Sequence, residues 1–449
     1  MNLAAKLAQR AASPVRVGLI GAGKFAAMFL AQARRTPGLH VAAIADLSPA
    51  RARANAAATG WPDGALDARD IAEAIRTGAT WLVEDGQAVA TASGIEVVIE
   101  ATGDPTAGVR HAMAAIAAKK HLVMVNVETD VLVGPLLARR AAEAGVVYSL
   151  AYGDQPALIC EQVDWARAAG FAVVAAGKGT KHRPEFHAST PDTVWGFYGL
   201  TPDHAAESGM NPKMFNSFLD GTKSGIEMAA VANATGLVPA PGGLSFPPCA
   251  VYALAERLKP KAEGGLLAHK GQVEVVSSHD ATGEVANNLR WGTYVVFEAA
   301  DDYVRRCFAD YGLKTDSSGR YAALWRPYHL IGLELGISVA SVALRGEPTG
   351  APTGFRADVV CVAKRRLEAG EVLDGEGGYR VWGRLMPAAD SLAMGALPIG
   401  LAHGRLARAV EAGQVVHRAD VALDETVEAV RLRAEMERLF APGAARAAE

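Results

Sequence analysis

The sequence contains few cysteines, and they lie far apart. Four are spread over 449 residues, and no two of them form a CxxC pair. This spacing excludes the common zinc motifs and a disulfide framework, so we expect reduced thiols in a cytoplasmic protein. The four residues are Cys160, Cys249, Cys307 and Cys361.

Long apolar runs and blocks of one charge are also missing. No stretch approaches the roughly 20 apolar residues of a membrane-spanning helix. The N-terminal segment, which carries Lys6 and Arg10, lacks the apolar centre of a signal peptide. The formal net charge is −3, without a cluster of Lys and Arg. We therefore expect no membrane or nucleic-acid partner and a small-molecule substrate.

Apolar residues, in contrast, make up half of the chain. A chain of this length exceeds what one hydrophobic core supports. We expect a dinucleotide-binding domain at 1–150, an α+β domain at 151–350 for substrate binding and homo-oligomer assembly, and a small β-rich domain at 351–449. The boundary near residue 350 lies in the loop GEPTGAPTG, which is rich in Gly, Pro and Thr.

The clearest motif is a glycine turn between two apolar runs. Val15–Ile20 reads as a strand, the turn GAGKFA follows, and a helix-length segment leads to a second strand that ends at Asp46. Gly21 permits a tight turn, and Gly23 lets the backbone approach a pyrophosphate at the helix N-terminus. The pattern predicts a dinucleotide site that also includes Lys24 and Phe25.

The acidic residue that closes the second strand bears on cofactor choice. A carboxylate at Asp46 can accept hydrogen bonds from both ribose hydroxyls of NAD and would repel the 2′-phosphate of NADP. Arg51 and Arg53 follow closely and would weaken that preference. The sequence therefore favours NAD and leaves NADP open.

Strands and helices alternate through the first 150 residues. Apolar runs at 95–100, 121–125 and 146–150 are separated by helical patterns, which predicts the doubly wound parallel sheet of a Rossmann α/β fold. Thr102 and Gly103 lie in the turn after the first of these strands. Since such sheets bind ligands at the carboxyl ends of their strands, we assign both residues to the cofactor site.

Three lysines are candidates for the proton acceptor that oxidation of an alcohol requires. Lys178 and Lys181 directly follow a predicted strand, and Lys223 lies near Asp220 and Glu227 at a helix start. We expect Lys223 with Asp220, and also Lys178, to act in catalysis. The alternative is that these lysines are ordinary solvated side chains.

Two further groups have polar chemistry in apolar surroundings. If the chain is extended there, Glu128 and Asp130 point the same way and could contact substrate or bind a divalent metal. The alternative is that they cap a helix that begins near Val131. Arg326 and His329 either bind a substrate phosphate or carboxylate or form an internal ion pair.

Several motifs together resemble a known family. They are GAGKFA from Gly21, VMVNVETDV from Val123, GDQP from Gly153, AGKGTK from Ala176, LDGTKSGIEMAAVANATGLVP from Leu219 and RPYHL from Arg326. The chain is similar over nearly its whole length to homoserine-dehydrogenase-like oxidoreductases with a C-terminal SAF domain. Within them it resembles the DXR-like (DRL) branch, which includes a 1-deoxy-D-xylulose 5-phosphate reductoisomerase. The segments 364–373 and 407–416 resemble the two halves of the SAF β-clip.

The resemblance implies an NAD(P)-dependent oxidoreductase that acts on a CH–OH group, with two departures. Homoserine dehydrogenases carry a lysine after the strand that here ends at Val125, whereas this chain has Asn126-Val127-Glu128, which argues against homoserine oxidation. The biosynthetic reductoisomerases use NADPH, whereas Asp46 points to NAD and catabolic oxidation. We expect oxidation, with or without isomerisation, of a small polyhydroxylated acid or sugar phosphate. The alternatives are a reductoisomerase of isoprenoid biosynthesis and a non-catalytic sensor of a dinucleotide or carbohydrate.

Overall fold

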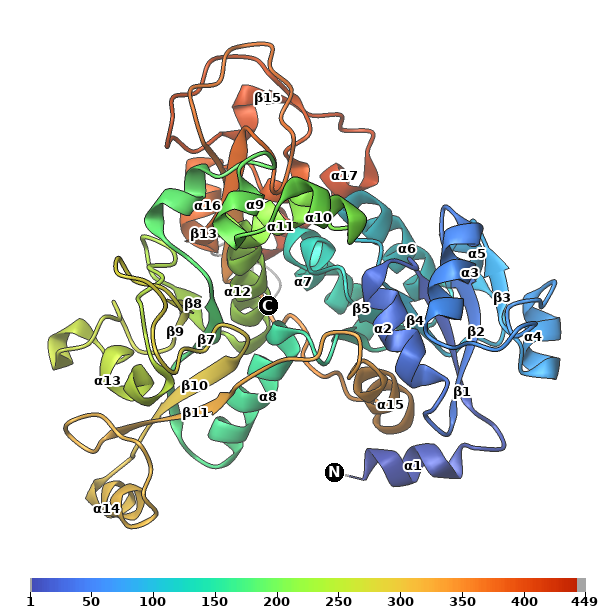
Figure 1. Ribbon diagram of the computed structural model, residues 1–449, viewed down its shortest axis with the longest axis horizontal. Helices are drawn as coiled ribbons and strands as arrows, with labels where there is room; N and C mark the ends of the chain where they lie inside the picture. Colours follow the sequence, from blue (N-terminus) through green and yellow to red (C-terminus); the bar gives the residue numbers. More distant parts are fainter. Residues whose placement is uncertain (1, 442–449) are drawn as a thin grey trace. The chain divides into compact units, whose positions relative to one another are not determined.

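The computed structural model describes residues 2–441, which divide into two units (Figure 1). The first contains residues 2–158 and 330–353, and the second contains 159–329 and 354–441. The first boundary falls within helix α8, Gln155–Ala168. None of the helices formed by residues 2–441 has the length and apolar content that crossing a bilayer would take.

The first unit is built on a six-stranded parallel sheet in the order β3-β2-β1-β4-β5-β6. The strand order reverses between β1 and β4, and sheets of this kind bind ligands at the carboxyl ends of the strands beside such a reversal. The predicted doubly wound α/β fold is thereby confirmed. The strands are β1 Val15–Ile20, β2 Leu39–Ala45, β3 Trp81–Val83, β4 Val97–Glu100, β5 His121–Met124 and β6 Tyr148–Leu150.

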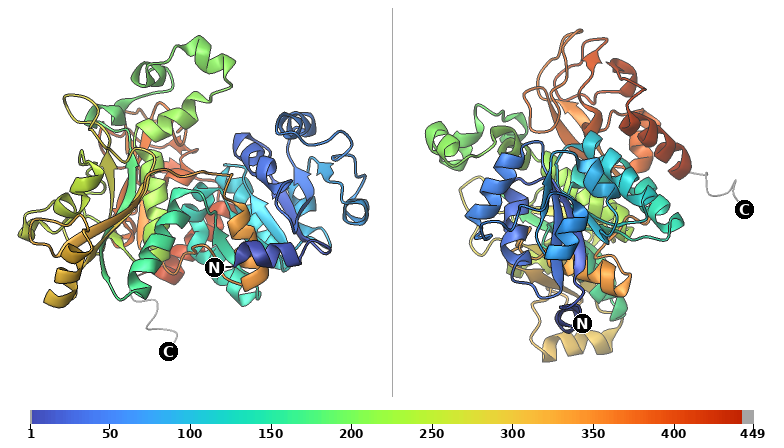
Figure 2. Two further views of the ribbon diagram at one scale, coloured as in Figure 1. Left: turned by 60° about the horizontal axis from the view of Figure 1, so that its bottom comes forward. Right: turned by 90° about the vertical axis from the view of Figure 1, so that its right-hand side faces the viewer.

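Helices cover both faces of this sheet (Figure 2). Helices α2, α3 and α15 pack together on one face, and α5, α6 and α7 pack together on the other. Buried strand side chains, such as Val17 and Leu19, form the core with Phe29 and Leu30 of α2. The helices are α1 Leu3–Gln9, α2 Lys24–Ala33, α3 Pro49–Ala58, α4 Ile71–Thr77, α5 Gly86–Thr91, α6 Pro105–Ala117, α7 Val127–Glu143 and α15 Gly336–Arg345.

Residues 330–353 belong to the first unit, whereas the sequence-based division placed 330–350 in the middle domain and 351–353 in the C-terminal domain. Leu335, Val339 and Val342 of this segment are buried in the same core as the β1 side chains. The loop after α15 lies along β6, since Leu150 N donates to Gly350 O at 2.7 Å. The Gly- and Pro-rich loop is therefore part of the first unit, and the chain changes units only after Thr353.

The second unit contains a mixed five-stranded sheet in the order β11-β10-β7-β9-β8. Strands β7, β9 and β8 are parallel, whereas β10 runs antiparallel to both β7 and β11. The strands are β7 Ala172–Thr180, β8 Val238–Pro239, β9 Gln272–Ser277, β10 Thr293–Glu298 and β11 Tyr321–Arg326. The helices up to residue 329 are α9 Val194–Tyr198, α10 Pro202–Glu207, α11 Pro212–Leu219, α12 Thr222–Thr235, α13 Leu254–Arg257 and α14 Asp302–Asp310.

The C-terminal strands and the mixed sheet pack against the same helix, α12 (Thr222–Thr235). Helix α12 contacts β9 and also the antiparallel pair β12 (Ala357–Ala363) and β13 (Val381–Pro387). Gly383 N donates to Thr222 Oγ1 at 2.8 Å, and a Cβ on Gly225 would lie 3.3 Å from Gly383 O. Residues 354–441 of the predicted separate domain thus form one compact unit with residues 159–329. The remaining elements are α16 Ala388–Met394, β14 Arg405–Leu406, β15 Val421–Ala422 and α17 Glu428–Phe440.

The repeated segments 364–373 and 407–416 are related by approximate two-fold symmetry. Leu367 and Val410, which are equivalent in the repeat, exchange hydrogen bonds in both directions, at 2.9 and 3.0 Å. The glycines Gly370 and Gly413, also equivalent, have φ of +90° and +78°. The N–H of each glycine donates a 2.8 Å hydrogen bond to the carbonyl oxygen of the residue just before the opposite segment, Leu406 for Gly370 and Ala363 for Gly413. The weak sequence repeat therefore corresponds to two interlocked, structurally equivalent turns.

Ending the chain at Thr353 tests this division. We expect the first unit to keep its fold and dinucleotide binding, because all its residues remain. We expect the second unit to unfold, because the apolar face of α12 loses β12 and β13. Limited proteolysis and dinucleotide titration measure the two effects separately. A protease-resistant second unit in the shortened chain would show that β12 and β13 are an appendage.

Candidate functional site

The turn between β1 and α2 requires glycine at its first position. Gly21 has φ +91°, and a Cβ there would lie 2.6 Å from Ala101 O, in the turn after β4. Gly21 N donates to Ala45 O of β2 at 2.8 Å. Backbone from three strands therefore converges at this glycine, and a larger residue would separate them.

Gly23 meets different surroundings. It is the N-cap of α2, with extended backbone, and a Cβ there would have no protein atom within 4 Å. No side chain caps this helix, and its first turn contains no acidic residue. The exposed N–H groups and the positive end of the helix dipole suit a phosphate. The residues present thus fit a dinucleotide pyrophosphate, with Lys24 exposed and Phe25 packed against the core.

Asp46 holds the turn that contains both glycines. The carboxylate is buried at the end of β2, and its Oδ2 accepts from Ala22 N at 2.9 Å. Its Oδ1 accepts from Ser48 N at 2.8 Å and from Arg51 Nη2 at 2.7 Å. Arg53 instead binds Asp67 at 2.8 Å. Of the two arginines considered for cofactor choice, Arg51 therefore lies at the acid and Arg53 does not.

A second polar group closes β4. Glu100 is fully buried; its Oε1 accepts from Thr102 Oγ1 at 2.6 Å and lies 3.2 Å from His111 Nδ1, and its Oε2 has no partner. Gly103 has φ +72° with open space beside it. Thr102 and Gly103 were predicted from the sequence, whereas Glu100 and His111 were not. A charged residue ending an apolar strand was the available signal.

The prediction that Glu128 and Asp130 lie on extended chain and point the same way is wrong. Both lie in the first turn of α7, where Asn126 Oδ1 caps the helix by accepting from Thr129 N at 3.1 Å. Residues two apart on a helix point to nearly opposite sides. Asp130 is buried and accepts from Tyr148 Oη at 2.7 Å. In the described part of the chain, no three His, Cys, Asp or Glu side chains are arranged to hold a metal ion.

In the second unit, a buried ion pair connects the mixed sheet to α12. Lys178 on β7 donates to Glu227 on α12, and their side chains are 5% and 3% exposed. In the sequence, Glu227 lies one helical turn after Lys223, and the structure shows that Glu227 binds Lys178 of β7. Lys223 lies partly exposed in the first turn of α12.

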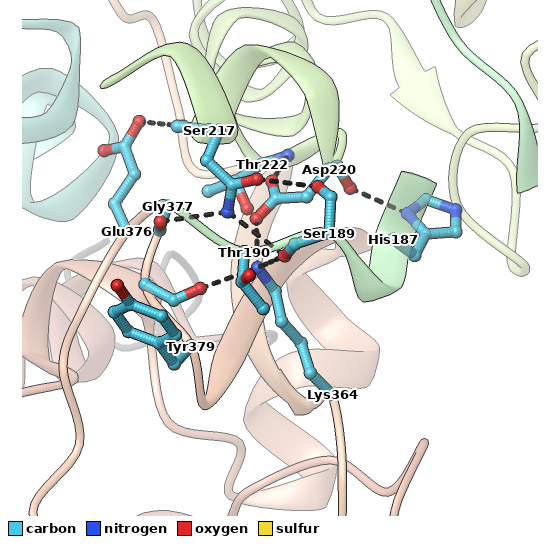
Figure 3. A network of polar contacts seen from close by, with 12 residues as sticks. His187, Ser189, Thr190, Ser217, Asp220, Thr222, Lys364, Glu376, Gly377 and Tyr379 are labelled. Carbon is cyan, nitrogen blue, oxygen red and sulfur yellow. Dashed lines mark hydrogen bonds and ion pairs between the residues drawn. The ribbon is translucent and has the colours of Figure 1, made fainter. Parts of the chain in front are cut away.

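Asp220 is paired with a lysine far along the chain (Figure 3). Lys364 Nζ donates to Asp220 Oδ2 at 2.7 Å, to Ser189 O at 2.7 Å and to Gly378 O at 2.8 Å, which uses all three of its protons. Asp220 Oδ1 accepts from Thr222 N at 2.9 Å. Burial raises the pKa of Asp220, although the Lys364 ammonium opposes the change. This carboxylate is therefore bound by Lys364 and by the first residue of α12 inside the protein.

Two histidines lie beside this ion pair. His187 Nδ1 donates to Asp220 O at 2.7 Å, and its ring stacks on Trp382 with centroids 4.0 Å apart. His182 stacks on Phe246 at 3.9 Å and lies 4.7 Å from the His187 ring. Burial, followed by the charge of His187, lowers the pKa of His182 to about 3, so His182 is neutral at physiological pH.

The other predicted residues lie on nearby loops or strand ends. Lys181 donates to Phe197 O at 2.6 Å. Arg326 ends β11 and stacks over Tyr328 at 5.8 Å, and half-buried His329 hydrogen-bonds Trp291 O through Nδ1 at 2.7 Å. Both residues thus lie at or just after the carboxyl end of β11, and Arg326 has a further interaction.

Two protein-family models match parts of this chain. Residues 15–126 match the oxidoreductase family with an NAD-binding Rossmann fold, and residues 153–335 match the catalytic domain of oxidoreductase DRL. The chain is an oxidoreductase with an NAD-binding domain. The DRL match includes Lys178, Asp220 and Lys223, whereas Lys364 lies outside it. Neither match tests the SAF or homoserine-dehydrogenase resemblance.

Solved structures give weaker similarities to this oxidoreductase. The Bacillus subtilis protein yvaA is 14% identical, with 74% of this chain and 89% of that chain covered and a TM-score of 0.35. The 1-deoxy-D-xylulose 5-phosphate reductoisomerase from Zymomonas mobilis with NADPH is 20% identical, with 49% of this chain and 58% of that chain covered and a TM-score of 0.34. An oxidoreductase from Agrobacterium radiobacter with NAD⁺, L-tartaric acid and magnesium is 16% identical, with 38% of this chain and 45% of that chain covered and a TM-score of 0.27. A search of curated proteins finds no match.

The two turn glycines provide a matched test of the dinucleotide site in this oxidoreductase. Gly21→Ala should destabilise the first unit by about 1–3 kcal/mol, because alanine is strained at this φ and meets Ala101. Gly23→Ala should change stability by less than about 1 kcal/mol but weaken dinucleotide binding about tenfold or more, because the methyl group occupies space open to the ligand. Thermal unfolding and dinucleotide titration measure both. Unchanged affinity in folded Gly23→Ala would remove this turn from the site.

Proposed function

We propose that this oxidoreductase uses NAD to oxidise a CH–OH group of a small polyhydroxylated acid or sugar phosphate. The observation that carries the proposal is the uncapped N-terminus of α2 at Gly23, in a unit whose residues 15–126 match an NAD-binding family. Buried Asp46 beside this turn supports NAD. When bound, the nicotinamide would accept the hydride.

We assign to Lys223 the role of the base that accepts the proton of the substrate hydroxyl. This residue lies in the first turn of α12 and is partly exposed, so its amine can reach a ligand. Lys178 and Asp220, the other candidates, are buried in ion pairs with Glu227 and Lys364.

Turnover assays with the full chain test this assignment. Absorbance at the nicotinamide band is followed with NAD or NADP and a panel of sugar acids and sugar phosphates. Lys223→Met should lower turnover by about 10²- to 10⁴-fold with dinucleotide affinity nearly unchanged, the usual loss when a general base is removed. Lys261→Met, at an exposed lysine of the same unit, is the control. Equal turnover in both variants would exclude Lys223 as the base.

A reductive reaction with NADPH is the second candidate. Its support is Arg51, whose Nη2 lies 2.7 Å from Asp46 Oδ1 and whose side chain is 60% exposed, so it could turn to a 2′-phosphate. Tighter binding of NADP than of NAD would favour this reaction and reverse our cofactor assignment. Dinucleotide binding without turnover of any panel compound would instead favour a sensor.

A further inference from the structure

Three cationic side chains lie together at the end of β7. Lys181 and Arg183 follow the strand directly, and Arg290 lies in the segment that returns to it. Gly179 N donates to Gly292 O at 3.0 Å, and a Cβ on Gly179 would lie 3.0 Å from Arg290 N. The backbone thus brings the two segments together, two residues from Lys181 on one side and at Arg290 on the other.

The charges of these side chains act on one another. Burial, followed by the positive charges of Arg290 and Arg183, lowers the pKa of Lys181. The same three cations contribute to lowering the pKa of nearby His279 after its burial. Like charges held this close repel one another, which costs stability unless an opposite charge joins them.

Carboxylates of the described chain do not neutralise the cluster. Arg290 makes no ion pair there and stacks its guanidinium over Trp291 at 4.7 Å, and Lys181 donates to the carbonyl of Phe197. Arg183 approaches only Glu185, at 3.9 Å, and its buried Nε has no hydrogen-bond partner.

The two acidic residues nearest the cluster are occupied within their own loop. Asp280 Oδ1 accepts from Thr282 N and Oγ1, both at 2.7 Å, and from Gly283 N at 3.0 Å. Glu284 Oε1 accepts from Asn288 Nδ2 at 3.0 Å. Their negative charge therefore reaches the cations only at longer range.

We propose that Lys181, Arg183 and Arg290 bind a doubly charged oxyanion of the phosphate class. Arg290 makes no ion pair and Arg183 approaches its carboxylate only at 3.9 Å, so both guanidinium groups can donate to oxygens in the planar geometry that they favour. Three positive charges suit a dianion better than a carboxylate, which carries one charge. The identification of this anion as the phosphate group of the substrate rests on the proposed function, whereas the anion site itself does not.

Phosphate titration of the full chain tests the site at constant ionic strength. Trp291 is 59% exposed beneath Arg290, so its fluorescence reports binding, and Trp291→Phe identifies its share of the signal. Lys181→Met and Arg290→Met should each weaken inorganic phosphate binding about tenfold or more without lowering the melting temperature, since each relieves repulsion. Arg306→Met is the matched control, because Arg306 stacks on Tyr303 of α14.

Separate outcomes decide between the claims. Acetate that binds as tightly as phosphate, with the same dependence on the variants, would overturn the dianion assignment. Phosphate binding unaffected by Lys181→Met and Arg290→Met, or no Trp291 signal at all, would overturn the site. Variant-sensitive phosphate binding in a protein that oxidises no panel compound would support the site while the proposed function fails.

Discussion

Replacing Lys178 with methionine is expected to lower the free energy of unfolding by about 3–5 kcal/mol, because Glu227 would remain buried without its partner. Both side chains are at most 5% exposed, so water cannot solvate the remaining carboxylate. Urea denaturation measures this loss as a lower midpoint at an unchanged slope. This is among the largest single-residue effects that we expect in the second unit.

The double variant Lys178→Met/Glu227→Gln separates stability from chemistry. With both charges removed, most of the lost stability should return, since neutral groups of similar volume often replace a buried ion pair at little cost. If the double variant folds normally but turnover falls, the pair also serves the reaction. Full stability in Lys178→Met alone would contradict the buried pair itself.

The dinucleotide-binding half could be predicted from sequence because its signals are local. The strand predicted at Val15–Ile20 has the same bounds in the structure, and the turn glycines have the conformations that their motif implies. Asp46 closes β2 as expected. In such a fold, a strand, its turn and the next helix are adjacent in the chain, so periodicity and turn chemistry are sufficient.

The partners of the candidate catalytic residues could not be predicted in this way. We paired Asp220 with Lys223 because they are close in sequence. Asp220 instead ends α11, Gly221 turns the chain with φ +91°, and the carboxylate binds Lys364, which lies 144 residues away. Contacts at such separation leave no periodic signal. The return of residues 330–353 to the first unit was missed for the same reason.

Helix boundaries caused the error at Asp130. We considered an extended segment at Glu128 and Asp130 and, as the alternative, a helix that begins near Val131, whereas Asn126 caps α7 and the helix begins at Val127. The cap residue was present in the sequence, but the following Glu-Thr-Asp was interpreted as an extended ligand pair. The shift moves Asp130 from a strand end to the buried side of α7, where its oxygen meets Tyr148.

This position makes Asp130 sensitive to pH. Burial raises its pKa to about 7, and the hydrogen bond from Tyr148 opposes the change. Below about pH 4, the carboxyl is protonated in both folded and unfolded chains. As the pH rises towards 7, the unfolded chain releases this proton and the folded chain keeps it, so the folded state loses stability through this range. Above about pH 7, Asp130 is ionised in both states and causes no further change in stability.

Asp130→Asn should remove this dependence. Relative to the variant, the wild type is expected to lose about 4 kcal/mol of unfolding free energy between pH 4 and pH 7, at about 1.4 kcal/mol per pH unit of pKa shift. Urea denaturation of both proteins across this range measures the difference. Tyr148→Phe should widen the range, because it removes the hydrogen bond that stabilises the charged carboxylate. Parallel stability curves for wild type and Asp130→Asn would show that Asp130 titrates at the same pKa in the folded and unfolded chains.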